Sequence, residues 1–353
     1  MIGLGAKRLY DAPAAIAVRG LYDPSAAAFM NDALTGLGGG DFVVHVHGWA
    51  QILSPAIFAA LRPHARRVVL TCHDFFLACP NGNYTVYPKA RACDAKPMSL
   101  DCALRHCDKR QYAHKVWRLA RHASLHRQLA PSKNLFRYLA IHAQMIPILE
   151  KGGVPASRIR VLPNPSDAPS APRVVAENNR EILYVGRLEF EKGADIAAAA
   201  ARKIGARIRF VGDGRARASV EAEGGDAHFE GWRSRAEMAR YFANARFLVA
   251  PSRCVEPFGL AAVEALQAGL PVVAAPTLLI ARDLERLGMG VVAEKPDTDG
   301  FARAFEALLG DDACIRAMSE RARAGAADIA STSADWLAAH LAVYDEAARE
   351  ARG

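Results

Sequence analysis

Residues 247–275 read FLVAPSRCVEPFGLAAVEALQAGLPVVAA, and this stretch decides the fold class. Short apolar runs lie at both of its ends, and the part between them is broken at Pro251 and closed by Gly269. This order predicts a strand, a loop, a helix and a second strand, with Pro257 in the first turn of the helix. It is typical of one βαβ unit in a parallel sheet.

The predicted helix of residues 257–268 contains one charged residue, Glu264, among apolar and small ones. A helix that is apolar on all sides is expected to be buried, and an unpaired carboxylate is costly to bury. Glu264 should therefore meet backbone donors, a cation or ligand hydroxyls. Glu256 lies eight residues earlier, beside a helix N-terminus that favours anions. The pair suits a ligand with hydroxyls and phosphate, although Glu264 bonded to neighbouring amides and a solvated Glu256 would also explain it.

Length and composition favour a two-domain α/β protein. A chain of 353 residues is long for a single hydrophobic core. Hydrophobic residues make up 51% and charged residues 23%, which excludes general disorder. The opening residues, MIGLGAKRLYDAP, place charges ahead of any long apolar run, so they make a poor secretory signal and predict a cytoplasmic protein. The longest uncharged stretches contain glycine and proline and predict no transmembrane helix.

The net charge of +8 is concentrated in the first half of the chain. Residues 1–172 contain 21 Lys and Arg against 10 Asp and Glu, whereas residues 173–353 contain 24 against 27. A basic half can face nucleic acid, an anionic membrane surface or a phosphorylated acceptor. A solvated basic face without a partner is also common.

The segment 105–137 is strongly basic, with nine Lys or Arg, four His and one Asp. Apolar residues recur in it at helical spacing, which predicts a basic amphipathic helix. Such a helix can contact an anionic membrane, which would make the protein peripheral on the inner face of that membrane. It can equally pack on its own domain with a solvated back, and the sequence leaves both interpretations open.

Histidines follow two predicted strands in the first half. The strand of residues 42–46 ends at His45-Val46-His47-Gly48, and the strand of residues 67–71 ends at His73-Asp74. Residues 54–61 between them are expected to form the crossover helix. Polar residues at strand ends are where open α/β sheets bind ligands. This edge is therefore a candidate site.

The stretch PNPSDAPSAP at residues 163–172 is a linker, and a second strand and helix pattern begins after it. Alternation of this kind predicts a doubly wound parallel sheet. We expect a basic N-terminal domain over residues 1–172, a second domain over 173–333, and a last helix within 334–353 that crosses back over the first domain. The predicted strands of the second domain are residues 182–185, 208–211 and 247–250, with an edge strand near 228–229, and its predicted helices are 194–203 and 234–243.

Four of the seven cysteines lie close together in the sequence, at Cys79, Cys93, Cys102 and Cys107. Their spacing does not match a paired CxxC zinc site. Disulfides are not expected in a cytoplasmic protein. The irregular spacing favours reduced thiols over a zinc site, without deciding between them.

Three loops follow strands of the second domain at one edge of the predicted sheet. The first contains Gly186-Arg187-Leu188 and Lys192-Gly193, the second Gly212-Asp213-Gly214, and the third residues 256–260. Arg187 can bind two phosphate oxygens at once, and Lys192 supplies a compact positive charge. The helix N-terminus after Gly193 adds amide donors. Together the loops predict a cradle for a diphosphate.

These motifs resemble the family 4 retaining glycosyltransferases of GT-B fold. The resemblance rests on Gly186-Arg187-Leu188 with Lys192-Gly193, on residues 210–214, and on residues 256–272, in which Glu256 and Glu264 form an E-x7-E pattern. It extends to residues 44–48 and 71–74. It implies two Rossmann-like, doubly wound domains facing across a cleft. It also implies a nucleotide-diphosphate sugar as donor, a glycan or lipid-linked acceptor in cell-surface glycan assembly, no cofactor, no metal and no nucleic-acid partner.

The resemblance also implies roles for single residues. The catalytic group would contain Arg187 and Lys192 at the donor diphosphate, Glu256 at the donor sugar, and His73 in the sugar pocket. The donor-binding group would contain Gly186 and Glu264, with Glu264 at the ribose hydroxyls, and three loop residues near the sugar and phosphate: Phe258, Gly259 and Leu260.

Some features favour other interpretations. Only about forty residues precede the His-x-His strand, where the family has a strand and a glycine-rich loop, so a non-catalytic partner subunit of the same fold is an alternative. A nucleotide-sugar epimerase shares the two-domain organisation but gives no reason for Arg187 and Lys192 at this spacing. The absence of G-x-G-x-x-G disfavours a dinucleotide oxidoreductase. Asp297-x-Asp299 precedes a predicted helix at 301–309, where helix capping is favoured over metal binding.

Overall fold

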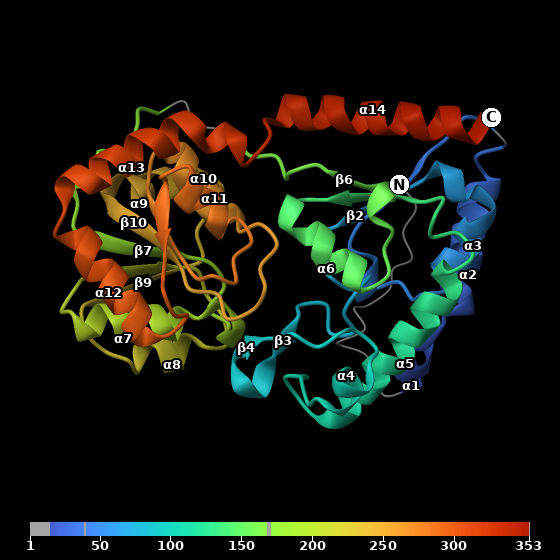
Figure 1. Cartoon of the computed structure of the whole chain (residues 1–353), viewed down its shortest axis with the longest axis horizontal. Helices are drawn as coiled ribbons and strands as arrows, with labels where there is room; N and C mark the ends of the chain where they lie inside the picture. Colours follow the sequence, from blue (N-terminus) through green and yellow to red (C-terminus); the bar gives the residue numbers. More distant parts are fainter. Residues whose placement is uncertain (1–14, 39, 168–170, 353) are drawn as a thin grey trace. The chain divides into compact units, whose positions relative to one another are not determined.

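The computed structural model describes residues 15–38, 40–167 and 171–352 (Figure 1). The chain divides into two compact units, which are described separately. Unit 1 comprises Met1–Lys89, Cys93–Leu162 and Leu337–Gly353, and unit 2 comprises Ala90–Ala92 and Pro163–Trp336. None of the helices in the described part of the chain has the length and apolar character needed to span a bilayer.

Unit 1 is built on a parallel sheet with the strand order β1-β2-β5-β6. Strand β2 is buried over its whole length, as expected for a central parallel strand covered on both faces. The strands are β1 (Val44–Val46), β2 (Val68–Cys72), β5 (Arg137–Ala140) and β6 (Ile159–Val161), and two further strands are only two residues long, β3 (Thr85–Val86) and β4 (Arg91–Ala92). The helices around this sheet are α1 (Ala15–Leu21), α2 (Pro24–Thr35), α3 (Ile57–Leu61), α4 (Leu100–Leu104), α5 (Tyr112–Leu129), α6 (Ile146–Lys151) and, from Leu337 onward, α14 (Ser333–Arg352).

Unit 2 is a doubly wound parallel sheet with the strand order β12-β11-β10-β7-β8-β9. The chain moves outward from β7 to β9, returns to the middle at β10, and moves outward again on the other side. The strands are β7 (Glu181–Val185), β8 (Ile208–Val211), β9 (Ala227–Gly231), β10 (Ala245–Ala250), β11 (Val272–Ala274) and β12 (Gly290–Val292). The helices are α7 (Ala194–Lys203), α8 (Arg217–Glu221), α9 (Met238–Asn244), α10 (Leu260–Ala268), α11 (Ala281–Arg286), α12 (Thr298–Leu309) and α13 (Asp312–Gly325).

The βαβ unit predicted from residues 247–275 is present as β10, α10 and β11, but its helix begins later than expected. Gly259 has φ +76°, outside the helical region, and a Cβ there would lie 2.8 Å from Leu278 Cδ1. The preceding loop pairs instead with the chain after β11, since the Glu256 amide donates to the Thr277 carbonyl at 3.0 Å. The prediction that Pro257 lies in the first helical turn is therefore wrong.

The sequence predicted one basic amphipathic helix over residues 105–137, but in the structure only part of this segment is helical. Helix α5 covers only Tyr112–Leu129. Before it, Asp108 accepts the Arg110 amide at 2.9 Å in a turn that is not part of the helix. Its Leu125 is buried, and so is Arg121, whose guanidinium donates to the Ala50 and Leu53 carbonyls. Helix α5 therefore packs against unit 1 with part of its basic face turned inward.

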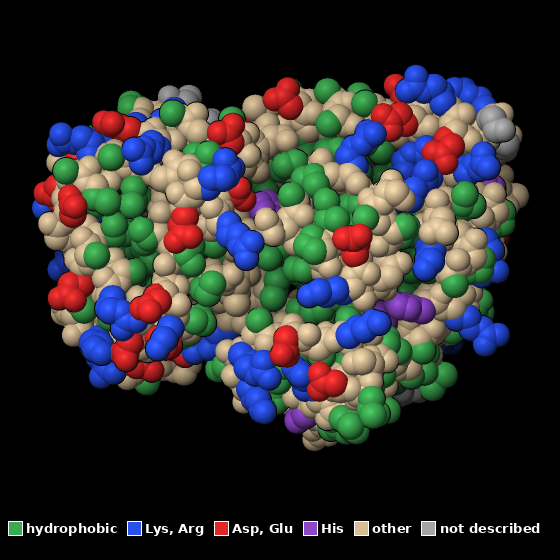
Figure 2. Space-filling view, viewed as in Figure 1, with side chains coloured by type: hydrophobic (Ala, Val, Ile, Leu, Met, Phe, Trp, Pro, Cys, Tyr) green, Lys and Arg blue, Asp and Glu red, His purple; other side chains and the backbone are tan. Residues whose placement is uncertain are grey.

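On the face drawn in Figure 2, Lys and Arg side chains are spread among acidic and hydrophobic ones and do not form one continuous patch.

The capping interpretation of Asp297 is confirmed, because its carboxylate accepts the Gly300 amide at 2.8 Å at the start of α12. Asp299 forms an ion pair with Lys203 at 2.7 Å.

Candidate functional site

The strand order of unit 2 indicates where a ligand can bind. Strands β7 and β10 are neighbours in the sheet, but the chains that leave them continue toward opposite edges. At such a switch point the loops after the two strands diverge and leave a crevice at their carboxyl ends. The loops concerned are residues 186–193 and 251–259, which contain most of the predicted site residues.

Lys192 and Glu256 are brought together at this point. Lys192 Nζ lies 2.7 Å from Glu256 Oε1, and the two side chains are 23% and 21% exposed. Gly193 allows the approach, because it has φ +71° and a Cβ there would lie 2.1 Å from the Pro251 carbonyl oxygen. The ion pair is thus fixed by a close backbone contact between the two loops.

Two helix N-termini beside this ion pair lack a side-chain cap. Helix α7 begins after Gly193 and α10 begins after Gly259, and neither residue offers an acceptor to the first-turn amides. Elsewhere in unit 2, Asp297 caps α12 and Asp311 caps α13. Uncapped amides and the positive end of the helix dipole favour an anion. The site is therefore open to negatively charged groups at both helices.

Arg187 lies at the same edge and is exposed. The Tyr184 hydroxyl donates to the Arg187 carbonyl at 2.9 Å, and the Gly186 amide donates to the Val211 carbonyl at 3.0 Å. These bonds fix the backbone on which the side chain stands. Among the described residues, none forms a hydrogen bond or ion pair with the Arg187 guanidinium, so its donors are available.

Glu264 is half-buried in α10, and a cation meets it as the sequence suggested. Arg235 Nε lies 3.6 Å from Glu264 Oε1, with Arg235 itself 70% exposed. Burial raises the pKa of Glu264, and the nearby guanidinium opposes this effect. Both side chains line a pocket of about 530 Å³. Glu264 is therefore accessible, but none of the residues that line this pocket belongs to the loops 186–193 and 251–259.

The remaining predicted donor residues differ in exposure. Phe258 is buried, with 3% of its surface exposed, whereas Leu260 is 48% exposed. The side chain of Phe258 therefore serves packing, and only its backbone can serve a ligand.

Trp232 is a candidate that the sequence prediction missed. It directly follows β9 at the carboxyl edge of the sheet and is 74% exposed. A large aromatic ring in water at this edge offers a surface on which a flat group can stack. The signal in the sequence was Gly231-Trp232-Arg233 after a predicted edge strand, where an apolar residue has no structural purpose.

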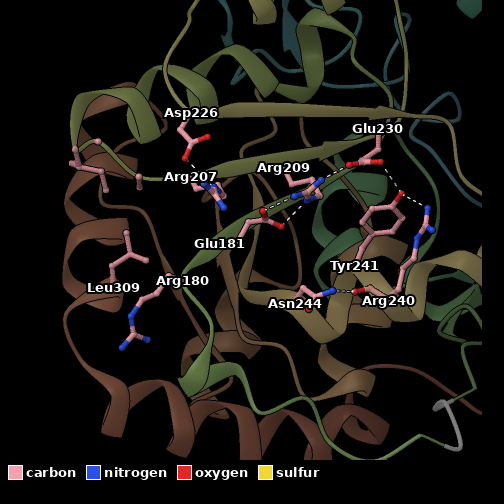
Figure 3. A pocket seen from close by; sticks show the side chains of 13 residues that line it. Arg180, Glu181, Arg207, Arg209, Asp226, Glu230, Arg240, Tyr241, Asn244 and Leu309 are labelled. Atoms are coloured by element: carbon pink, nitrogen blue, oxygen red, sulfur yellow. Dashed lines mark hydrogen bonds and ion pairs between the residues drawn. The ribbon is translucent and has the colours of Figure 1, made fainter.

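A different pocket of unit 2 lies at the opposite edge of the sheet (Figure 3). It has a volume of about 870 Å³ and is lined by residues within or just before β7, β8 and β9, together with three residues of α9. Its arginines are already paired, for example Arg209 with Glu181 and Glu230, and Arg207 with Asp226. The pocket is thus a neutralised surface rather than a site for an anion.

Unit 1 carries a separate cluster of histidines at the carboxyl ends of β1 and β2. His47 Nδ1 lies 2.9 Å from His73 Nε2. His45 bonds Thr71 Oγ1 at 2.7 Å and the hydroxyl of Tyr344 in α14 at 2.6 Å. His73, the residue predicted for the sugar pocket, is exposed and its orientation is fixed by His47.

The histidines of this cluster are kept neutral. Burial, together with the nearby imidazoles of His47, His340 and His73, lowers the pKa of His45 to about 3. Burial is also the main cause that lowers the pKa values of His47 and His73, and His340 adds to both effects. His73 therefore acts as a neutral hydrogen-bonding group near pH 7.

Solved structures that are similar to this chain share its architecture. Sucrose-phosphate synthase from Thermosynechococcus elongatus matches with a TM-score of 0.63 and 19% identity, over 90% of this chain and 77% of that one. The HepE protein of Anabaena, solved with UDP and glucose, matches with a TM-score of 0.62 and 17% identity, over 89% and 80% of the two chains. The chain has the GT-B fold. The fold class predicted from the sequence is confirmed.

Sequence comparison covers less of the chain. Residues 179–311 match the family model described as glycosyl transferases group 1. Glycogen synthase of Mycobacterium tuberculosis is 32% identical over 194 residues, which is 50% of this chain and 46% of that protein. D-inositol 3-phosphate glycosyltransferase 1 of Catenulispora acidiphila is 37% identical over 118 residues, or 33% and 27% of the two chains. The chain spans less than half the length of these curated relatives.

The histidine cluster predicts that acid destabilises the protein. The lowered pKa of His45 in the folded state means that the unfolded chain binds a proton more readily below about pH 6.5. The contribution of neutral His45 to the free energy of unfolding should be complete above that pH and should decrease as the pH falls toward 3. Each such group contributes at most about 1.4 kcal/mol per pH unit. We expect the denaturant concentration at the unfolding midpoint to be lower at pH 5 than at pH 7.

The variant His45→Gln tests the assignment. Glutamine retains an amide for Thr71 and Tyr344 but cannot be protonated, so the decline with pH should be shallower than in the wild type. Measurements at pH 8 supply the baseline for any change that does not depend on pH. Equal slopes for the variant and the wild type would contradict the assignment.

Proposed function

We propose that this protein is a retaining glycosyltransferase of the family 4 type. It would transfer a hexose from a nucleotide-diphosphate sugar to a glycan or lipid-linked acceptor in the assembly of a surface polysaccharide or glycolipid. The match of residues 179–311 to group 1 glycosyl transferases and the GT-B fold support this proposal. The observation that carries it is the Lys192–Glu256 ion pair at 2.7 Å between two uncapped helix N-termini.

The proposed donor site accounts for each group in that crevice. The diphosphate would lie against the amides that begin α7 and α10, with Arg187 and Lys192 beside it. Without donor, Glu256 neutralises Lys192. With donor bound, the ammonium would turn to the phosphate, and Glu256 would become free to accept hydrogen bonds from the sugar. His73 belongs to unit 1, and its role as a neutral group at a sugar hydroxyl is proposed from the family resemblance alone.

Bond cleavage explains why cations are needed there. As the bond between the anomeric carbon and the phosphate oxygen breaks, negative charge gathers on the leaving diphosphate. Fixed donors that face this charge stabilise the transition state more than the ground state. The acceptor hydroxyl would then attack from the face that the leaving group vacates, which retains the anomeric configuration. In this proposal two cations and two helix N-termini replace a divalent metal, and no cofactor takes part.

The nucleoside would extend along the carboxyl edge of the sheet. Glu264 would accept hydrogen bonds from the ribose hydroxyls, since it is accessible and paired only at 3.6 Å with Arg235. Trp232 offers a stacking surface for the base. HepE was solved with UDP, so UDP-sugars are the first donors to test.

A screen of nucleotide sugars tests the function against its alternatives. Stabilisation and hydrolysis would be measured with UDP-, GDP- and ADP-sugars, with and without a chelator. We expect one donor to raise the unfolding temperature and to be hydrolysed slowly in both conditions. A non-catalytic subunit should neither bind nor cleave a donor, and an epimerase should change the sugar without releasing nucleotide. Loss of cleavage with chelator, restored by magnesium or manganese, would contradict the metal-free mechanism.

We also propose that the protein acts peripherally on the cytoplasmic face of the membrane, because the first half of the chain is basic and a lipid-linked acceptor would lie there. Each Lys or Arg near an anionic surface contributes about 1 kcal/mol before screening. Sedimentation with anionic vesicles should therefore exceed sedimentation with neutral vesicles and weaken with salt. Equal binding to both vesicle types would exclude this attraction.

The two cations should matter more for turnover than for donor affinity. Removing one preorganised donor at a developing charge typically lowers turnover by about 10²–10³-fold. We expect this loss for Arg187→Ala and for Lys192→Ala at saturating donor. Arg187→Lys should recover only part of it, because an ammonium cannot make the planar two-point contact.

Two further variants complete this experiment. Glu264→Gln should mainly weaken donor binding, since the ribose is remote from the breaking bond. Lys203→Ala is the matched control, because Lys203 lies at the far end of α7 and forms an exposed ion pair with Asp299. Wild-type turnover in both Arg187→Ala and Lys192→Ala would show that the diphosphate cradle is misplaced.

A further inference from the structure

The four cysteines that the sequence groups together meet in one place in unit 1. Cys79, Cys93, Cys102 and Cys107 line the same cavity, although the chain between them contains little regular structure. Three of them are at most 7% exposed, and all are free thiols. The cavity has a volume of about 10 Å³, roughly the room that one water-sized sphere occupies.

A buried lysine lies beside these sulfurs. Lys115 is 1% exposed, and its Nζ lies 3.3 Å from Cys102 Sγ. Over the described ranges, the hydrogen-bond partners of this ammonium are the sulfurs of Cys102 and Cys107, with no carboxylate among them. A buried ammonium needs a negative partner, and neutral thiols do not supply one. Lys115 therefore places an N–H donor, and no acceptor, against the sulfurs of Cys102 and Cys107, which is the kind of partner that thiolates need.

Nitrogen donors face every sulfur of the cluster. The backbone amides of Asn81, Gly82 and Tyr84 face Cys79 and act to lower its pKa, although burial dominates and raises that pKa to about 11. Asn81 Nδ2 lies 3.5 Å from Cys107 Sγ. The Arg105 guanidinium lies 3.8 Å from Cys93 Sγ.

This arrangement is unusual for ordinary thiols. A buried thiol packs as a small hydrophobic group and needs no surrounding donors. Metal-bound thiolates, by contrast, are oriented and tuned by N–H donors around them. The donors, Lys115 among them, lie around the same cavity as the sulfurs, and the Cys79 thiol also donates to Asn81 Oδ1 at 3.1 Å.

We propose that Cys79, Cys93, Cys102 and Cys107 bind a single zinc ion that stabilises the segment 79–115. Four thiolates on a divalent ion carry two negative charges, and Lys115 offsets one of them; Arg105, beside Cys93, is already paired with Asp94 and Asp101. Binding would release the four thiol protons to solvent. Four cysteine ligands are typical of structural zinc, and the size of the cavity favours one ion over an iron–sulfur cluster.

The sulfurs are not yet arranged for coordination. Within the described residues, no three side chains of the types His, Cys, Asp and Glu are grouped so that they could hold a metal ion. Cysteine has a single side-chain torsion, so sulfurs that line one cavity can converge by rotation about the Cα–Cβ bond. The four sulfurs that line one small cavity and the N–H donors around them carry the proposal, and its test does not depend on transferase activity.

Metal content provides the first test. The full chain would be purified under reducing conditions, and its zinc measured by mass spectrometry. We expect about one zinc per chain in the wild type and in Cys314→Ser, a control in α13 of unit 2. Cys102→Ser and Cys107→Ser should lose it. A wild-type chain that is free of metal and takes up no added zinc would overturn the proposal, as would iron with visible absorption.

Two measurements address variants that fail to fold. Zinc would be removed from the wild type with a chelator and a reductant, and the unfolding temperature followed on adding back zinc or magnesium; only zinc should restore it. Lys115→Met retains length but not charge. Loss of an outer-shell partner typically weakens metal binding by about 10–100-fold, which competition with a zinc-binding dye would detect. Unchanged zinc affinity in Lys115→Met would contradict the charge argument.

Discussion

The close approach of two loops in unit 2 is the constraint on which the candidate site depends. Position 193 must be glycine, because the Pro251 carbonyl occupies the place of a Cβ and the backbone has φ +71°. The contact joins the loops that follow β7 and β10. These two strands are parallel neighbours, and the strand order of the sheet reverses between them. Lys192 and Glu256 lie on either side of the contact and meet at 2.7 Å. A backbone requirement thus determines the geometry of a charged pair.

That geometry comes at the expense of local stability. A glycine at the N-cap leaves the first-turn amides without a side-chain acceptor, and capping by Ser, Thr, Asn or Asp typically contributes about 1 kcal/mol. Helices α12 and α13, on the same unit, have aspartate caps. Helices α8 and α11 also begin without a side-chain cap, and the sheet of unit 2, which is buried over most of its length, tolerates these weaker helix starts. Amides that remain unsatisfied in the free protein are those that an anionic ligand can satisfy.

Much of this organisation could be predicted from the sequence, and the failures have definite physical causes. Helix 194–203 and strand 208–211 were predicted with the bounds that the structure has, because their apolar periodicity is regular and their ends carry glycine. The start of α10 was misplaced, because Pro257 is compatible with a first turn and the loop before α10 pairs instead with the distant chain after β11. The partner of Glu264 was unpredictable for the same reason, since Arg235 lies 29 positions away. Trp232 was missed because exposure is a property of the fold.

The cysteines show the same limit from another direction. Their spacing along the chain argued against a metal site, because known zinc motifs are short and paired. In the structure the informative residue is Lys115, which the sequence placed in a predicted basic amphipathic helix without deciding what its basic face meets. Its burial among sulfurs cannot be read from the helical pattern, because helix α5 turns several basic side chains inward. Sequence spacing tests whether ligands are neighbours in the chain. The surroundings of a buried site indicate whether they can act together, and the zinc proposal rests on that second kind of observation.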